Sequence, residues 1–420
     1  MRTNAGVGAL PLVPLVAAVL AGIRSSFGPG VTVGLIVAVV LLPVWVPSLR
    51  AYRWAWSWLG LGLIAAATGM LLTWIDTYRP HSASLMAAQT LLLLALLGCL
   101  GVLLWSRREA GSPATATAFS LGILASTAIS GVEGENAWKF GWSVPIYLVV
   151  LSIAMWSGRR SVELVAVCVL ALTTVVTDSR SVTSFLVLAA ALVLWQMRPA
   201  PARRRPRTWA TIAGMGLMAL SAYYAMQSLI YEGVFGEAAL ERSQAQIETS
   251  GSLIAGGRPE LGASIALLLR TPLGIGSGLS PTAGDIWVAK TGMAALNYNP
   301  DNGYVDRFMF GGHFEVHSVL GDLWLLFGLP GALLGITALI GLVYGLGRQV
   351  ARRQASALVI FVSAFSVWNI FFSPLTGSYR LLALALALVA VEVAPRRIGS
   401  RSSVDDMDAA GWRASVGRPR

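Results

Sequence analysis

The sequence is poor in the residues from which metal centres, disulfides and hydrated surfaces are built. Its 420 residues include two cysteines, three histidines and two lysines, and only 12% are charged. Cys99 and Cys168 both lie inside apolar runs, which excludes a disulfide framework and a cysteine-based metal site. The charged fraction is also well below that of an ordinary water-soluble domain.

Apolar residues take the place of the missing charge. They make up 55% of the chain, and the mean hydropathy is +0.68. Apolar runs of about 17 to 25 residues, long enough to cross a hydrocarbon core as helices, recur from end to end. The sequence therefore predicts an all-α polytopic membrane protein with about twelve transmembrane helices. We place them at 7–23, 31–49, 54–75, 84–105, 115–131, 142–157, 161–177, 182–196, 208–229, 328–347, 356–372 and 376–393.

The net charge of +11 is carried by short clusters between the apolar runs. A basic chain can bind nucleic acid, but this distribution is typical of membrane orientation, and we expect no nucleic-acid partner. With twelve spans the clusters fall on one side, which the positive-inside rule assigns to the cytoplasm. We therefore predict a multi-pass protein of the cytoplasmic (inner) membrane with both termini in the cytoplasm. The clusters are Arg50 with Arg53, Arg107 with Arg108, Arg159 with Arg160, the loop 198–207, Arg348 with Arg352 and Arg353, and the C-terminal tail.

One long hydrophilic segment interrupts the apolar pattern. It predicts a membrane domain over 1–229 and an extracytoplasmic loop domain over 230–316. Three membrane helices follow within 317–394, and residues 395–420 lack periodicity, which predicts a disordered cytoplasmic tail. Any chemistry that needs polar residues is therefore expected at the outer face.

Within the loop, residues 236–248 and 258–270 have the pattern of amphipathic helices. The stretch "TPLGIGSG", 271–278, resembles a nucleotide-binding loop in its glycines. No Lys-Ser/Thr pair follows it, and no strand–helix unit surrounds it, so the nucleotide reading fails. We interpret it as a turn that positions the loop against the membrane domain.

Two of the three histidines lie in "HFEVH", where His313 and His317 are four residues apart. On a helix this spacing would suit a zinc pair. However, Glu315 follows the first histidine by two residues instead of one, and Gly311 and Gly312 disfavour a helix through His313. We therefore predict no metal site. His313 is interpreted as a loop residue, and His317 is either a functional residue or a polar residue that begins a membrane helix.

Four arginines are expected on the outer side, where positive charge is disfavoured. They are Arg180, Arg258, Arg270 and Arg380. An arginine near the membrane plane is costly unless it snorkels, pairs or binds an anion. For Arg180, pairing with Asp178 remains an alternative to anion binding.

Three segments carry a family resemblance. "TDSRSVTSFLVL" is similar to a Ser-Arg turn ahead of a membrane helix, and "GGRPELGASIALLLRTPLGIGSG" to a Gly-Arg stretch leading to Pro-x-Gly-x-Gly. "HSVLGDLWLLFGLPG" looks like a His-Asn-x-x-Leu-Glu segment followed by Gly-x-x-Gly, with Ser318, Gly321 and Asp322 in place of Asn, Leu and Glu. In this order, with twelve spans and one large outer loop, they resemble the O-antigen ligase superfamily, which includes O-antigen polymerases and bacterial O-oligosaccharyltransferases. The matching positions are Arg180, Arg258, Pro272, Gly274, Gly276, Gly278, His317, Asp322, Gly328 and Gly331.

The resemblance implies inverting transfer of a glycan from a polyprenyl diphosphate-linked donor to an acceptor hydroxyl at the outer face, without a metal or a cofactor. It implies His317 as the base, since histidine titrates near neutrality. Arg180 and Arg258 would bind the donor diphosphate through charge-assisted hydrogen bonds. Asp322 follows His317 by five residues, so the two side chains would point apart on a helix, and we interpret it as a network residue. The candidate supporting residues are Asp322, Arg270 and Arg380.

The expected partners are the lipid-linked donor, a glycan or lipid acceptor, and membrane lipids. A polysaccharide polymerase, whose acceptor is another lipid-linked repeat unit, is the first alternative. A lipid-linked glycan transporter is the second. The position of the charge at the outer rim, instead of at mid-membrane, disfavours transport.

Overall fold

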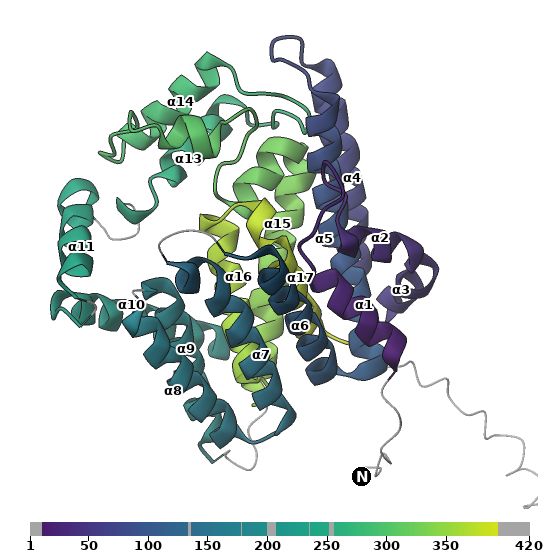
Figure 1. The fold of residues 1–420 in the computed structure, drawn as a ribbon, viewed down its shortest axis with the longest axis vertical. Helices are drawn as coiled ribbons and strands as arrows, with labels where there is room; N and C mark the ends of the chain where they lie inside the picture. The colour runs from purple at the N-terminus through teal and green to yellow at the C-terminus, as the bar shows by residue number, and fades with distance from the viewer. Residues whose placement is uncertain are drawn as a thin grey trace, which may run out of the picture.

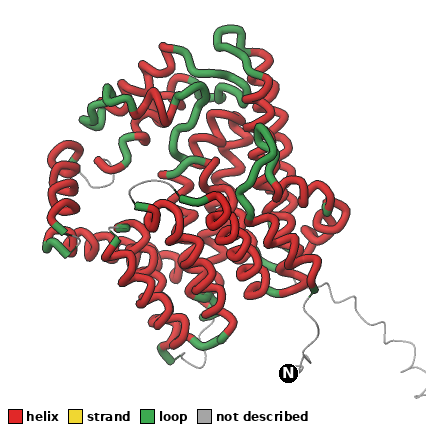
Figure 2. The backbone as a smooth tube through the Cα atoms, viewed as in Figure 1, coloured by secondary structure: helices red, strands yellow, loops and turns green. Residues whose placement is uncertain are grey.

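The computed structural model describes residues 11–132, 136–177, 179–199, 207–234, 236–251 and 256–393, which form helices and loops and contain no β-strand (Figure 2). The predicted all-α class is thus confirmed for this part of the chain. The predicted disordered tail, 395–420, lies outside the described residues. The helices are α1 (Leu12–Gly22), α2 (Val33–Val40), α3 (Leu42–Ser48), α4 (Ala55–Ile75), α5 (Ala83–Ala110), α6 (Ser112–Ser130), α7 (Ser143–Trp156), α8 (Arg160–Val176), α9 (Arg180–Met197), α10 (Thr208–Tyr231), α11 (Glu237–Ser250), α13 (Glu260–Arg270), α14 (Ala283–Ala294), α15 (Val319–Ala351), α16 (Ala357–Phe372) and α17 (Leu375–Val389), with short turns η1 (Leu49–Ala51), η2 (Trp138–Trp142) and η3 (Val305–Met309).

Helices long and apolar enough to cross a membrane confirm the membrane class. Among the described residues there are six: α4, α5, α6, η2 with α7, α9 and α15. A seventh would be α2 with α3, but the chain bends by 79° between them. Pro43 in the first turn of α3 favours this break, because its ring displaces the carbonyl four residues earlier.

The predicted number of twelve spans is not confirmed. Helices α1, α16 and α17 are apolar but have only 11, 16 and 15 residues. Fifteen residues rise about 22 Å, less than the roughly 30 Å of a hydrocarbon core. Most of α17 is nevertheless buried, since it packs against α5, α15 and α16 near the middle of the bundle (Figure 1).

Polar contacts tie the helix ends together in two groups. In one group, Arg107 donates to the carbonyls of Ala387 and Ala390, and Arg160 donates to that of Ala355. We call this the arginine-rich end, because the predicted clusters within the described residues, from Arg50 to Arg353, lie there. The other group contains the turn 76–82, helices α13 and α14, and the His317 segment. We call it the loop end.

Helix α15 differs most from its prediction. The expected span, 328–347, begins at Gly328, whereas helical structure begins at Val319. Gly328 itself has non-helical dihedral angles (φ 66°, ψ −158°). A Cβ on Gly335 would lie 3.7 Å from Cα of Leu320, although fifteen residues of straight helix span about 22 Å. The chain therefore folds back at Gly328, and a short arm packs against the longer arm that follows.

The segment 230–316 contains the two predicted helices as α11 and α13, and a third, α14, that was not predicted. α13 packs on α14 and also contacts α15 and α16. Buried residues of this segment, such as Leu267 and Met293, belong to the same hydrophobic core as the bundle. An independent loop domain is therefore not confirmed.

Candidate functional site

His317 lies at the loop end, directly before α15, with its backbone held on both sides. The N–H of Val316 donates to Asp322 Oδ1 at 2.8 Å, and the carbonyl of Val316 accepts from Ser264 Oγ at 3.0 Å. Ser318 caps α15 by accepting from the N–H of Gly321 and donates to the carbonyl of Ile370. Between these fixed neighbours His317 adopts φ 53°. Left-handed backbone is uncommon for a residue other than glycine and persists only where its surroundings impose it.

The imidazole of His317 has unused hydrogen-bonding capacity. Its Nδ1 is buried and has no partner among the described residues. Nε2 lies 3.9 Å from Glu315 Oε1, and the ring of Tyr304 packs beside the imidazole with the ring centres 5.9 Å apart. The side chain is 17% exposed, so the group is sheltered but reachable from one side.

Glu315 lies between the two histidines. Its Oε2 is 4.0 Å from His313 Nε2 and accepts a hydrogen bond from Thr376 at 2.7 Å. The carboxyl of Glu315 raises the pKa of His313. Burial acts to raise the pKa of Glu315, but His313 and Thr376 outweigh it, and this pKa is lowered. Residues 313–317 are not helical, so His313 is a loop residue that forms an ion pair.

Asp322 holds two chain segments at the site. It is 2% exposed, and its carboxyl oxygens accept from the N–H groups of Val316 and Leu375, both at 2.8 Å. The second bond ties the first residue of α17 to α15. Asp322 therefore acts on His317 through the backbone.

Arg258 approaches the same region from the segment before α13. Its guanidinium lies over the ring of Trp368 at 5.8 Å and makes no hydrogen bond or ion pair to a described residue. Its positive charge acts on Tyr304. Tyr304 therefore lies beside the imidazole of His317 and within electrostatic range of Arg258.

Tyr304 is held by a carboxyl group that the sequence did not single out. Its hydroxyl donates to Glu260 Oε1 at 2.7 Å. Burial first, and Glu260 second, raise the pKa of Tyr304. Glu260 Oε2 is buried and has no partner in the described part of the chain. Glu260 lies two residues after Arg258, in the first turn of α13. This proximity in the sequence is the feature that could have indicated it as a site residue.

Arg180 is the first residue of α9 and donates to Ser243 Oγ of α11 at 2.5 Å. One turn further, Phe185 packs against Trp368 with ring centres 5.9 Å apart. Trp368 thus lies between the start of α9 and Arg258. The alternative partner of Arg180, Asp178, lies outside the described residues.

The two supporting arginines have different surroundings. Arg270 is exposed at the end of α13, where it donates to the carbonyl of Gly284. Arg380 stacks on Tyr379 at 4.5 Å, and its Nε is buried and unpartnered within the described residues. The positive charges of Arg380 and Arg24 repel each other. Arg24, at the loop end after α1, is therefore a second cation that the sequence prediction missed.

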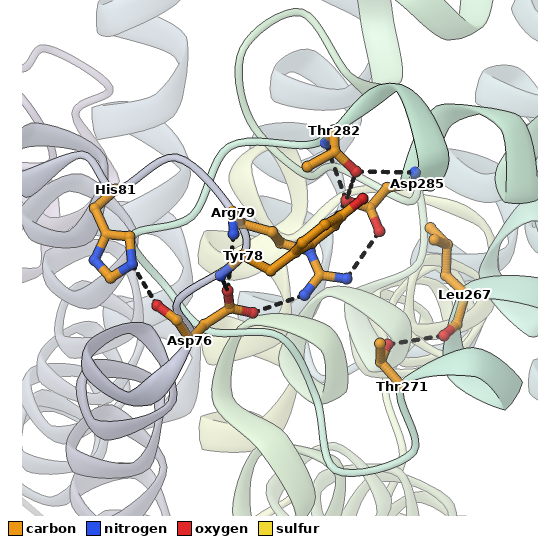
Figure 3. Close-up of polar contacts among 8 residues, drawn as sticks. All are labelled: Asp76, Tyr78, Arg79, His81, Leu267, Thr271, Thr282 and Asp285. Carbon is orange, nitrogen blue, oxygen red and sulfur yellow. Dashed lines mark hydrogen bonds and ion pairs between the residues drawn. The ribbon is translucent and has the colours of Figure 1, made fainter.

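A buried ion pair fixes α14 to the turn between α4 and α5 (Figure 3). Arg79 donates through Nε and Nη2 to both oxygens of Asp285, at 3.0 and 2.8 Å, and through Nη1 to Asp76 at 2.7 Å. Asp285 is fully buried and also accepts from Thr282, which caps α14. Burial acts to raise the pKa of Asp285, but the hydrogen bonds from Arg79 and Thr282 outweigh it and lower this pKa. We call this pair the Arg79–Asp285 clamp.

The glycine-rich turn packs where α15 folds back. The N–H groups of Ile275 and Gly276 both donate to the carbonyl of Leu325. A Cβ on Gly274 would lie 2.8 Å from Cα of Gly328, and one on Gly276 would lie 2.7 Å from the backbone of α4. The prediction that this turn positions the loop against the membrane helices agrees with these contacts, and glycine is required because backbones meet there.

The structure thus joins His317 and Asp322 through the backbone of Val316. Arg180, Arg258 and Arg380 lie at the same end of the bundle with partners of their own, and Arg270 contacts α14. Comparison with known proteins adds no relative: the chain matches no family model, no curated protein and no solved structure.

Proposed function

We propose that the chain transfers a glycan, with inversion, from a polyprenyl diphosphate-linked donor to an acceptor hydroxyl, and that the loop end faces the outside of the cytoplasmic membrane. It would then be an O-antigen ligase-like glycosyltransferase. The acceptor is a distinct glycan or lipid in a ligase and a second lipid-linked repeat unit in a polymerase, and the reaction at the anomeric carbon is the same.

One observation carries the proposal. His317, in a constrained left-handed backbone, has an Nδ1 with no partner among the described residues, and its imidazole packs beside Tyr304, which lies within electrostatic range of Arg258. The guanidinium of Arg258 is not neutralised by a carboxyl group of the described chain. A base and an unpaired cation at the same end of the bundle are the groups that transfer from a diphosphate requires.

In the proposed reaction His317 takes the proton of the acceptor hydroxyl. The acceptor oxygen forms a bond to the anomeric carbon while the bond from that carbon to the diphosphate oxygen breaks on the opposite face. The electron pair leaves with the diphosphate. Arg258 and Arg180 bind the charge that develops there, and Arg380 supports them from α17. Asp322 positions His317 through Val316.

The test is transfer from a purified polyprenyl diphosphate-linked oligosaccharide to an acceptor glycolipid. His317→Ala is expected to lower the rate roughly 10²- to 10⁴-fold, the usual contribution of a general base. His81→Asn is the matched control, because His81 is the exposed third histidine of the chain and its imidazole makes one hydrogen bond among the described residues, to the carbonyl of Asp76. Equal rates for the parent and a correctly folded His317→Ala protein would exclude the proposal.

A further inference from the structure

A polar cavity lies at the arginine-rich end, away from the site described above. Its volume is about 360 Å³, and it lies between α5, α6, α7, α15, α16 and α17. This volume is within the range of small-molecule sites. Among the described residues that line it, the cations are Arg107, Arg348 and Arg352, and the one carboxyl group is that of Glu392.

The three arginines differ in what they bind. Arg107 is engaged, because it donates to carbonyls at the end of α17 and to Glu392 at 3.3 Å. The side chains of Arg348 and Arg352 make no hydrogen bond or ion pair with any residue that the structure describes. Arg348 lies in the last turn of α15 and Arg352 caps the end of that helix, and both line the cavity. Two unpaired guanidinium groups thus face one cavity.

The rest of the lining suits the boundary between head group and acyl chain. Gln349 and Gln354 add amide groups, whereas Met155, Val359 and Val391 add an apolar wall. Basic pockets between membrane helices bind the head groups of anionic lipids. The apolar wall can contact an acyl chain, whereas it would not stabilise a free anion.

We propose that this cavity binds the phosphate head group of an anionic phospholipid, with Arg348 and Arg352 as its ligands. The site is independent of the glycan-transfer proposal and lies at the opposite end of the bundle. Glu392 lies at its edge, 64% exposed, and weakens binding by repulsion.

The experiment titrates the purified full-length protein, in a neutral detergent, with phosphatidylglycerol and measures bound lipid by native mass spectrometry. Arg348→Gln with Arg352→Gln is expected to lower the affinity about 25-fold, at roughly fivefold for each arginine. The matched control is Arg50→Gln with Arg159→Gln, which removes the same charge from the same end without touching the cavity. Its affinity is expected to equal that of the parent.

A second pair of variants keeps both arginines. Glu392→Gln should tighten phosphatidylglycerol binding severalfold, whereas Glu109→Gln, an exposed acid at the same end, should not. Equal weakening by the two arginine pairs would reveal diffuse attraction and overturn the proposal. Displacement of bound phosphatidylglycerol by an equal concentration of phosphatidylcholine would overturn it as well. If inorganic phosphate, without any lipid, displaced the bound phosphatidylglycerol, the cavity would be assigned to a free anion and the proposal would be wrong.

Discussion

Two arginines at the arginine-rich end and two at the loop end have different partners. At the arginine-rich end, guanidinium groups bind backbone carbonyls: Arg107 contacts the end of α17, and Arg160 donates to the carbonyls of Arg353 and Ala355 between α15 and α16. The last turn of a helix leaves carbonyls unpaired. These arginines satisfy such groups and hold neighbouring helices in register.

At the loop end, Arg258 and Arg380 instead lie over Trp368 and Tyr379. A guanidinium that stacks through its face keeps the N–H donors around its edge available for an anion. Other arginines of this end are engaged: two carboxyl groups occupy Arg79, and Arg270 donates to the carbonyl of Gly284. Arg107 and Arg160 therefore build the bundle, whereas Arg258 and Arg380 remain available to a ligand. Arg348 and Arg352, in the cavity of the arginine-rich end, belong with the second group.

The largest expected effect is on the one loop-end arginine that is fully paired. Arg79→Met would leave Asp285 buried without its cation, which costs about 3–5 kcal/mol of stability. Arg270→Met, at an exposed residue of the same end, should change stability by less than about 0.5 kcal/mol. Denaturant titration in detergent measures both. Adding Asp285→Asn to Arg79→Met should recover part of the loss, and equal stability of the two single variants would contradict the clamp.

The second expected effect separates the two uses of arginine directly. Arg258→Ala should lower glycan transfer about 10²- to 10³-fold, as loss of one donor to a developing anion does, with little change in stability. Arg160→Met should do the reverse, because it releases the carbonyls of Arg353 and Ala355 but is not near the proposed site. Rates per folded molecule and unfolding curves of both variants decide this. If both lose only stability, the distinction between the two ends is wrong.

Local signals in the sequence predicted much of the fold. Each predicted span overlaps a helix or the bent pair α2–α3, because apolar runs and their boundaries are local features. The fold-back of α15 was missed because the residues on both sides of Gly328 are equally apolar. The Gly-Leu-Pro-Gly stretch, 328–331, predicted the start of a membrane helix at Gly328 but did not predict that the chain folds back there. The number of spans is not confirmed, since a short apolar helix buried in protein has the same composition as one that crosses lipid.

The site was only partly predictable for a different reason. The Arg79–Asp285 clamp joins residues 206 positions apart, and no single-sequence pattern indicates such a pair. The sequence pattern also did not indicate Glu260 or Trp368 as site residues. A glutamate in the first turn of a helix and a tryptophan in an apolar run are ordinary features. His317, Arg180 and Arg258 were chosen from motif resemblance, and their catalytic role remains a prediction.

The smallest expected effect tests the ion pair beside the proposed base. The pKa of His313 is raised, so its contribution to stability is complete below the unfolded value of about 6.5 and is lost as the pH rises through the folded value. The pKa of Glu315 is lowered, so its contribution is complete above about 4.3 and is lost as the pH falls. His313→Asn should therefore destabilise most between these values, near pH 5.5, and less at pH 9. His313 is 36% exposed, so the loss should stay below about 1 kcal/mol. In a Glu315→Gln background most of the pH dependence of the His313→Asn effect should be lost, because Glu315 is the main cause of the raised pKa of His313. An unchanged pH dependence there would assign it to another partner.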